Sequence, residues 1–351
     1  MLKSLKYKDN TLHVLDQRLL PHRVEWLCCA DATCVAKAIR EMAVRGAPAI
    51  GVAAAYGYLL AARAVAARGE GLDVESMQAA YRELAAARPT AVNLAWAVDH
   101  MLGIAQDERH NTADAIRKAL LDEAQRLADA DVATNKALAT HGAELVKDGD
   151  TILHHCNTGM LATVDYGTAL GVIRMAHEQG KRIHVLLDET RPRLQGSRLS
   201  AWECEQLGIP YDIIPDTAAG YFMRRGEVNL VLFGADRVAA NGDVVNKIGS
   251  YQIAVLAREN GIPCYSVFPT STVDLTKRSG DDIPIEERPA EEVTDVTYEG
   301  RPIAPQGVRT ANPAFDVTPH RYVTGIVTEN GIAYAPLHLS LRKVMGVPLE
   351  I

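Results

Sequence analysis

Residues 151–159, TILHHCNTG, mark the point where the character of the chain changes. They read as the end of a buried strand that runs into Cys156 and then into an Asn-Thr-Gly turn. Further apolar, β-rich runs follow at residues 182–189, 211–215, 228–236, 263–268 and 323–330, with helical stretches between them. Continuous apolar strands joined by crossover helices are typical of a parallel sheet covered on both faces. The sequence therefore predicts an α/β, Rossmann-like C-terminal domain.

The N-terminal part predicts a smaller, mainly helical domain with a short antiparallel sheet. Residues 5–16 alternate around an Asp-Asn turn, as a hairpin does, and residues 24–30 add a third strand. Asp31 is placed to cap the next helix, and Pro48 opens an apolar one. A long helix over about residues 112–146 ends this region, so we place the domains at 1–130 and 131–351.

Composition narrows the class of protein. The net charge of −7 argues against a nucleic-acid-binding surface. Six cysteines without CxxC spacing predict free thiols in a reducing compartment. The N-terminus has no apolar signal region, and the longest uncharged apolar stretch, residues 46–62, is shorter than the roughly 20 residues of a membrane span. We therefore expect a cytoplasmic protein that binds neither nucleic acid nor membrane. Residues 269–321 read as an irregular segment that is either functional or a partner contact.

Several motifs are absent from the sequence. No GxGxxG follows a strand, and there is no GxxxxGK[ST], no HExxH and no Cys/His metal spacing. His154 and His155 are neighbours in a strand and point to opposite faces, so they cannot both bind one metal ion. The sequence predicts neither a dinucleotide cofactor nor a metal.

Polar residues at strand ends are the candidates for chemistry, because open α/β sheets bind their ligands there. Cys156 is either a buried small hydrophobe or a thiol activated near a helix N-terminus. Asp236 is either a turn residue or a proton-transferring acid, whose pKa desolvation at the end of an apolar strand would raise. Asn246 and Lys247 precede a helix, where they could hold an anion, and Lys247 could equally be a solvated loop residue.

Three further segments suit an anionic ligand. Residues 188–203, DETRPRLQGSRLSAWE, carry three arginines that fit either a phosphate or an inter-strand salt-bridge network. Residues 45–51, RGAPAIG, place Arg45 beside a helix start. Residues 87–97 repeat the pattern, with Arg88 before a helix that Thr90 would cap.

Together these motifs resemble the S-methyl-5-thioribose-1-phosphate isomerase family of methionine salvage. The resemblance extends over essentially the whole chain and rests on RGAPAIG, RPTAVNL, HCNTG, DETRPRLQGSRLSAWE and GADRVAANGDVVNKIGSY. It implies a homodimeric aldose–ketose isomerase with no cofactor, a sugar phosphate as its substrate, and Cys156 and Asp236 as the catalytic pair. It also implies a set of substrate and phosphate contacts, namely Arg45, Gly46, Ala47, Arg88, Gln195, Asn246 and Lys247.

Two alternatives accompany this interpretation. A related isomerase would act on ribose 1,5-bisphosphate or on a 5-deoxyribose phosphate, and its pocket at the C5 group would differ. A non-catalytic regulatory subunit of the translation initiation-factor type belongs to the same superfamily, but it has no need of Cys156 and Asp236.

Overall fold

The computed structural model describes residues 3–67, 74–88, 91–107, 109–110 and 112–348. It divides into two compact units. The first comprises Met1–Asn135 and Gly159–Gly167, and the second comprises Lys136–Thr158 and Thr168–Ile351. The short segment Gly159–Gly167, which directly follows Thr158, therefore belongs to the first unit although the residues on both sides of it belong to the second.

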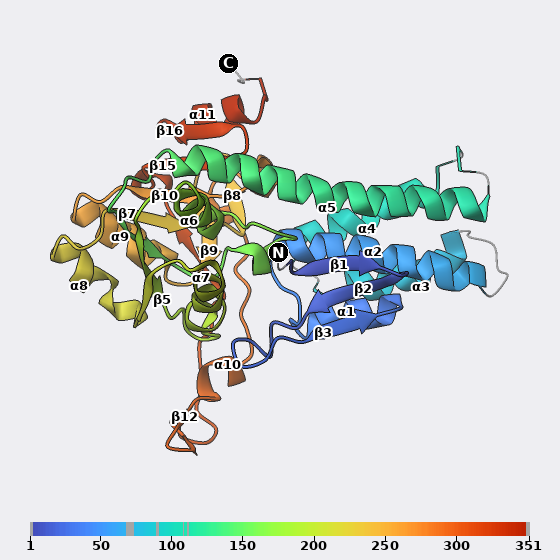
Figure 1. Ribbon diagram of the computed structural model, residues 1–351, viewed down its shortest axis with the longest axis horizontal. Helices are drawn as coiled ribbons and strands as arrows, with labels where there is room; N and C mark the ends of the chain where they lie inside the picture. Colours follow the sequence, from blue (N-terminus) through green and yellow to red (C-terminus); the bar gives the residue numbers. More distant parts are fainter. Residues whose placement is uncertain (1–2, 68–73, 89–90, 108, 111, 349–351) are drawn as a thin grey trace. The chain divides into compact units, whose positions relative to one another are not determined.

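The first unit combines a three-stranded antiparallel sheet with a group of helices (Figure 1). Its strands are β1 (Leu5–Lys8), β2 (Thr11–Leu15) and β3 (Trp26–Cys29), and its helices are α1 (Ala32–Arg40), α2 (Ala47–Ala67), α3 (Val74–Ala85), α4 (Val92–Ala105) and the first part of α5 (Ala113–Ala143). The Asp31 side chain accepts the N–H of Cys34 at 2.7 Å and caps α1, as the sequence predicts. Pro89 and Thr90 lie outside the described residues, so the predicted cap by Thr90 falls there too.

Helix α2 is the centre of the first core. At 21 residues it is longer than the 17-residue stretch expected, and by length and composition it could cross a membrane. However, 83% of an apolar 18-residue stretch of this helix is buried within the structure, and residues such as Tyr58 and Leu59 are completely buried. Its apolarity is therefore explained by packing against α1, α3 and α4.

The second unit is built on a seven-stranded sheet in the order β16-β15-β10-β7-β4-β5-β6. All neighbouring pairs are parallel except β15 and β16. The strands are β4 (Thr151–His154), β5 (His184–Asp188), β6 (Tyr211–Ile214), β7 (Leu230–Phe233), β10 (Cys264–Val267), β15 (Gly325–Thr328) and β16 (Gly331–Tyr334). All six predicted parallel strands are present, which confirms the predicted fold class.

Helices cover both faces of this sheet, and successive strand residues enter two separate cores. Ile152 belongs to one core and Leu153 to the other, as the alternation of side chains along a strand requires. The second unit's helices are the end of α5, α6 (Ala169–Glu178), α7 (Ala201–Leu207), α8 (Ala219–Arg224), α9 (Ser250–Glu259), α10 (Glu291–Thr294) and α11 (Leu337–Val344).

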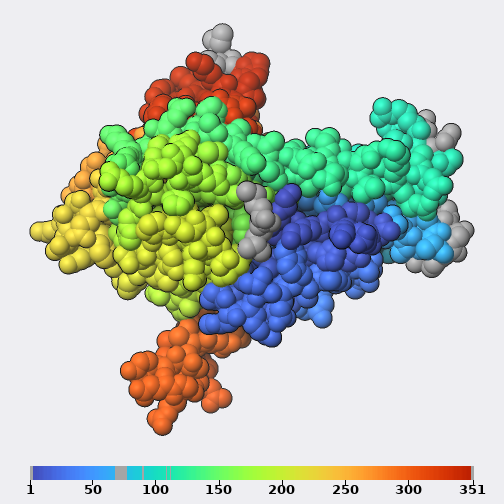
Figure 2. All heavy atoms as spheres, in the orientation of Figure 1, coloured from blue at the N-terminus to red at the C-terminus, as the bar shows by residue number. Residues whose placement is uncertain are grey.

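A second, four-stranded sheet lies in the same unit, and the sequence did not predict it. Its order is β11-β8-β9-β14, with β8 (Arg237–Ala239), β9 (Val244–Lys247), β11 (Val273–Asp274) and β14 (Phe315–Thr318). Because β11 and β14 come from residues 269–321, the expectation that this whole segment is irregular is wrong. Between them, the hairpin of β12 (Thr297–Tyr298) and β13 (Arg301–Pro302) projects from the second unit, with Tyr298 72% exposed (Figures 1 and 2).

One expectation about the cysteines is also wrong. Cys29 and Cys34 form a disulfide with their Cα atoms 5.2 Å apart, because α1 begins just after β3 and brings the two together. The other four, Cys28, Cys156, Cys204 and Cys264, are free thiols.

Candidate functional site

Cys156 holds an unusual backbone conformation just after strand β4. Its φ of +68° lies in the left-handed region, which residues with a β carbon rarely adopt. Thr190, at +62°, and Leu194, at +57°, share this feature and follow the neighbouring strand β5. Such strain persists only where the surroundings enforce it, and it gathers at functional sites. These three residues therefore mark the carboxyl edge of β4 and β5 as the candidate site.

Side chains from the segment after β5 hold both main-chain groups of Cys156. The Cys156 N–H donates to Oγ1 of Thr190 at 2.9 Å, and Thr190 Oγ1 donates to the Asp188 carbonyl at 3.0 Å. Oγ of Ser200 donates to the Cys156 carbonyl at 2.8 Å. Cys156 itself is buried, with 7% of the residue exposed. The strained conformation is thus fixed from two sides.

The sheet topology places Asp236 at the same edge. From β4 the chain adds β5 and β6 on one side and β7, β10 and β15 on the other, so the strand order reverses between β4 and β7. Ligands of open α/β sheets bind at such a switch point. Cys156 follows β4 and Asp236 follows β7, so the two flank the reversal. Asp236 is exposed, and its N–H donates to the Val245 carbonyl at 2.9 Å.

A close packing contact joins the ends of β4 and β7. A β carbon on Gly234 would lie 2.8 Å from Cγ2 of Thr158, so only glycine allows this approach. Thr158 also accepts, at Oγ1, the N–H of Leu170 in the first turn of α6 at 2.9 Å. However, α6 begins only at Ala169. Residues 160–168 separate the Asn-Thr-Gly turn from α6, and a short 3₁₀ helix, Met160–Ala162, lies among them.

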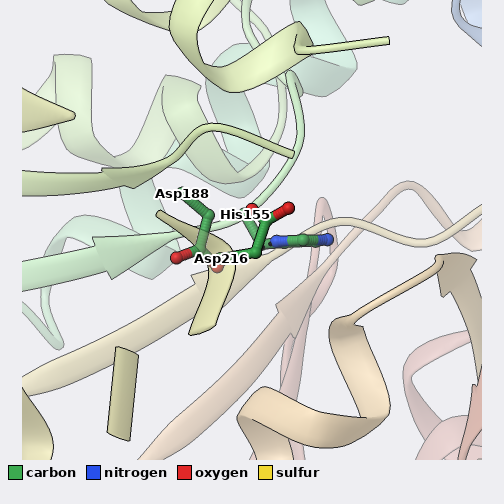
Figure 3. Close-up of side chains that lie close together, drawn as sticks. All are labelled: His155, Asp188 and Asp216. Atoms are coloured by element: carbon green, nitrogen blue, oxygen red, sulfur yellow. Dashed lines mark hydrogen bonds and ion pairs between the residues drawn. The ribbon is translucent and has the colours of Figure 1, made fainter. Parts of the chain in front are cut away.

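Beside Cys156, His155 is completely engaged in hydrogen bonds. Its Nδ1 lies 2.9 Å from Oδ2 of Asp188, and its Nε2 lies 2.9 Å from the carbonyl oxygen of Ile248. Figure 3 shows this imidazole with Asp188 and with Asp216, which comes from the segment after β6. The ring also lies against Gly249, where a β carbon would come within 2.9 Å of Cε1. His155 therefore ties the end of β4 to the segment after β9.

The surroundings shift the pKa values of the two adjacent histidines in opposite directions. For His154, burial lowers the pKa to about 4, so this histidine is neutral. For His155, burial also disfavours the charged form, but the hydrogen bond and the charge of Asp188 outweigh it and raise the pKa. The pKa values of these adjacent residues thus shift in opposite directions because their side chains face different surroundings.

His155, Asp188 and Asp216 also offer ligand atoms within 4.8 Å of one another, as a metal site would. Hydrogen bonds occupy these atoms except Oδ1 of Asp188, which is buried and has no hydrogen-bond partner among the described residues. Both His155 nitrogens have acceptors, and the two carboxylate oxygens of Asp216 each accept a main-chain N–H, from Thr190 and Arg191, at 2.7 Å. The donor set therefore matches a hydrogen-bonded cluster better than a metal centre.

Three predicted substrate contacts lie in this unit. Gln195 is buried, and its Oε1 has no hydrogen-bond partner among the described residues. Asn246 and Lys247 end strand β9 and are also buried, so Lys247 is not the solvated loop residue that was one alternative. Nζ of Lys247 donates to the Ala314 carbonyl at 2.8 Å and lies 4.8 Å from the ring centroid of Phe315.

Of the three arginines in residues 188–203, Arg193 forms a salt bridge, while Arg191 and Arg198 donate to main-chain carbonyls. Arg193 pairs with Glu292 at 2.9 Å, and Arg191 donates to the Val293 carbonyl at 2.9 Å. Both reach the α10 segment and hold the loop after β5 in place. They are structural contacts in this conformation.

The remaining predicted contacts lie in the first unit. Gly46, at φ +91°, precedes α2, which Ala47 begins. A β carbon on Gly46 would overlap the carbonyl of Ala162, so glycine is required there. Arg45 and Arg88 are partly buried. Ala162 belongs to the internal segment of the first unit that begins after Thr158.

Sequence reasoning missed the residues that hold Cys156. Thr190, Ser200 and His155 act through hydrogen bonds between strands far apart in the sequence, and no local pattern signals such bonds. Asp188, the last residue of β5, was the available signal, because a carboxylate that ends an apolar strand and is completely buried requires a partner.

The chain is similar to known proteins over nearly its full length. The model of the "Initiation factor 2 subunit family" matches residues 43–335. A "Methylthioribose-1-phosphate isomerase" of Pelotomaculum thermopropionicum is 51% identical over 346 residues, which cover 98% of this chain and 94% of the relative.

Two solved structures are similar throughout. The "5-methylthioribose 1-phosphate isomerase from Pyrococcus horikoshii OT3" superposes with a TM-score of 0.92 at 43% identity, covering 99% of this chain and 97% of that one. The "translation initiation factor eIF-2B, subunit delta, from A. fulgidus" superposes with a TM-score of 0.87 at 42% identity, covering 99% and 100%.

Proposed function

This chain belongs to the initiation factor 2 subunit family and within it to the methylthioribose-1-phosphate isomerases, and we propose from this premise how its residues act. The function is aldose–ketose isomerisation of S-methyl-5-thioribose 1-phosphate to S-methyl-5-thioribulose 1-phosphate, a step of methionine salvage. We assign the reaction to Cys156 and Asp236. The observation that carries the assignment is the strained left-handed backbone of Cys156 at the switch point that Asp236 also flanks.

The phosphate on C1 defines the chemical problem. It blocks the spontaneous ring opening that provides other aldoses with a carbonyl group, so the enzyme must open the ring itself. Asp236 donates its proton to the ring oxygen as the bond from C1 to that oxygen breaks. Because a carboxyl keeps its proton only where its charged form is desolvated, this role requires bound substrate to exclude water from Asp236.

Hydrogen then moves from C2 to C1. By the proton route, the Cys156 thiolate takes the C2 proton to form an enol, and the thiol, after its proton has exchanged with solvent, delivers a proton to C1. The Asp236 carboxylate takes the proton of the C2 hydroxyl, which leaves a ketone at C2 and restores both residues. By the hydride route, the C2 hydrogen moves to C1 with its electron pair, and Asp236 again takes the hydroxyl proton. Solvent deuterium at C1 supports the first route, and its absence supports the second.

The buried residues around Cys156 are suited to hold the substrate. Because Oε1 of Gln195 is a buried acceptor without a partner among the described residues, it can accept a hydrogen bond from a sugar hydroxyl. Lys247 brings a buried positive charge, which suits the phosphate. Asn246, Arg45, Gly46, Ala47 and Arg88 complete the proposed substrate contacts. We also propose a cytoplasmic homodimer, for which the family resemblance is the support.

The proposal is tested with S-methyl-5-thioribose 1-phosphate labelled with ¹³C at C1 and C2. A new ketone signal, with phosphate still bonded to C1, is the expected result. Cys156→Ser and Asp236→Asn should each lose most turnover while substrate still binds, as measured by calorimetry. Wild-type turnover in either variant would remove that residue from the mechanism. Conversion of ribose 1,5-bisphosphate in preference would favour the related isomerase.

A further inference from the structure

The proton count of the His155–Asp188 pair follows from its hydrogen bonds. The Ile248 carbonyl can only accept, so Nε2 of His155 carries a hydrogen. The contact of 2.9 Å between Nδ1 and Oδ2 of Asp188 needs a second hydrogen, because an unprotonated nitrogen and a carboxylate oxygen are both acceptors. The pair therefore holds one proton more than a neutral imidazole beside a carboxylate.

The surrounding carboxylates favour this proton on the imidazole, although burial raises the pKa of Asp188 as well. Asp188 and Asp216 both favour the cationic form of His155. Asp316, on β14, interacts with the His155 charge as well, and it accepts the N–H of Gly249 at 2.7 Å. The titratable groups that face the pair from all packed elements are His154, Asp188, Glu189, Asp216, Lys247 and Asp316. Carboxylates predominate, which favours an imidazolium at His155.

Asp188 connects this charge to the backbone of Cys156. Its carboxylate binds the imidazole, while its carbonyl accepts from Oγ1 of Thr190, the atom that accepts the Cys156 N–H. The peptide bond from His155 to Cys156 closes the ring of contacts. A change in the orientation of the imidazole therefore changes the conformation of Cys156.

We propose that His155 and Asp188 are positioning residues for the reaction: their shared proton fixes the left-handed conformation of Cys156 and places a positive charge beside it in the chain. The charge favours the thiolate over the thiol. The Ile248 carbonyl aligns the same imidazole with the segment that carries Asn246 and Lys247. This inference rests on the proposed role of Cys156.

The test is the variant Asp188→Asn. Its amide N–H₂ can donate to Nδ1 while Nε2 still donates to Ile248, so the geometry is kept and the extra proton is lost. We expect kcat to fall on the order of 10- to 100-fold, the range that loss of an outer hydrogen-bond partner costs in metal sites. KM should change far less, because substrate contacts are retained.

A second readout reports on Cys156 without substrate. The rate of its alkylation by iodoacetamide is followed against pH by peptide mass spectrometry, in a Cys28→Ser background that removes the exposed free thiol. Cys204 and Cys264 do not interfere, because burial raises the pKa of Cys204 to about 12 and that of Cys264 further still. In Asp188→Asn the midpoint of the profile should rise by about one pH unit.

The chain provides a matched control pair. Nε2 of His184, at the opposite end of β5, lies 2.9 Å from Oδ2 of Asp212, and the two side chains are 37% and 70% exposed. Asp212→Asn should leave kcat and the alkylation profile unchanged. If Asp188→Asn does not fold, His155→Asn replaces it, because Nδ2 of asparagine can occupy the position of Nδ1 and still donate to Asp188.

Two outcomes would overturn the inference. One is wild-type kcat together with a wild-type alkylation profile in Asp188→Asn. The other is a loss of kcat with lower thermal stability but an unshifted profile, which would reduce the pair to a structural contact. Cys156→Ser, assayed in parallel, separates the two proposals. Full activity there would contradict the catalytic role of Cys156, while the alkylation profile would still report on His155 and Asp188.

Discussion

The main-chain N–H of Cys156 donates to Oγ1 of Thr190 at 2.9 Å, which joins the end of β4 to the segment after β5. Thr190→Val keeps the shape of the side chain and removes the acceptor. The buried N–H then lacks a partner, which costs about 1–3 kcal/mol of unfolding free energy. Because Cys156 is no longer fixed, we also expect kcat to fall by roughly tenfold or more.

Thr190→Ser is the control for this prediction, since it keeps the hydroxyl. It should retain most activity, measured as initial rates alongside urea unfolding of both variants. A valine variant as active as the serine variant would show that the hydrogen bond does not position Cys156.

Gly249 provides a second test of the same edge. It has a φ of +105°, and a β carbon there would approach the His155 ring at 2.9 Å. Gly249→Ala therefore adds backbone strain of about 1–2 kcal/mol and also displaces the imidazole. We expect a loss of both stability and kcat.

Gly261 separates these two effects. Its φ is +68°, but no atom lies within 4 Å of a β carbon there. Gly261→Ala should lose similar stability in thermal unfolding and keep its activity. Equal kcat in the two alanine variants would contradict the importance of the contact between Gly249 and His155.

The sequence predicted the parallel sheet because its strands are continuous apolar runs that need only local patterns to be recognised. It did not predict β8, β9, β11 and β14, which are two to four residues long and form a sheet from distant segments. Residues 269–321 read as irregular because they are too polar for a core strand, whereas the pairing of β11 with β8 and of β14 with β9 is a tertiary effect.

The features of the candidate site also fall into those that the sequence predicts and those that it does not. Cys156 and Asp236 could be identified because each follows an apolar strand within a distinctive motif. The left-handed conformation of Cys156 and the contacts of His155 could not, since they depend on Thr190, Asp188 and Ile248 reaching them across the sheet. Residue types predicted the chemistry, and tertiary hydrogen bonds supply its geometry.

The disulfide between Cys29 and Cys34 predicts the number of reactive thiols. A chain with this bond should react at four cysteines with Ellman's reagent after unfolding in guanidinium, since Cys28, Cys156, Cys204 and Cys264 are free. Treatment with a reducing agent before the assay should raise the number to the six cysteines of the sequence. Six thiols without reduction would mean that the pair is reduced in the purified protein.

Asp131, on α5, predicts a dependence of stability on pH. Burial raises its pKa to about 7, although its Oδ2 accepts the N–H of Val164 at 2.7 Å. In the unfolded chain its pKa returns to the ordinary aspartate value of 3.8, so between pH 3.8 and about 7 the folded state binds the proton more tightly than the unfolded chain does. The stabilisation is complete below about pH 4 and is lost as the pH rises through 7. Asp131→Asn, which cannot ionise, should therefore show a smaller fall of the unfolding midpoint between pH 5 and 8 than the wild type.

Asp129→Asn, at an exposed position of the same helix, is the control and should follow the wild-type curve. Identical slopes for all three proteins in differential scanning fluorimetry would show that Asp131 is ionised throughout this range.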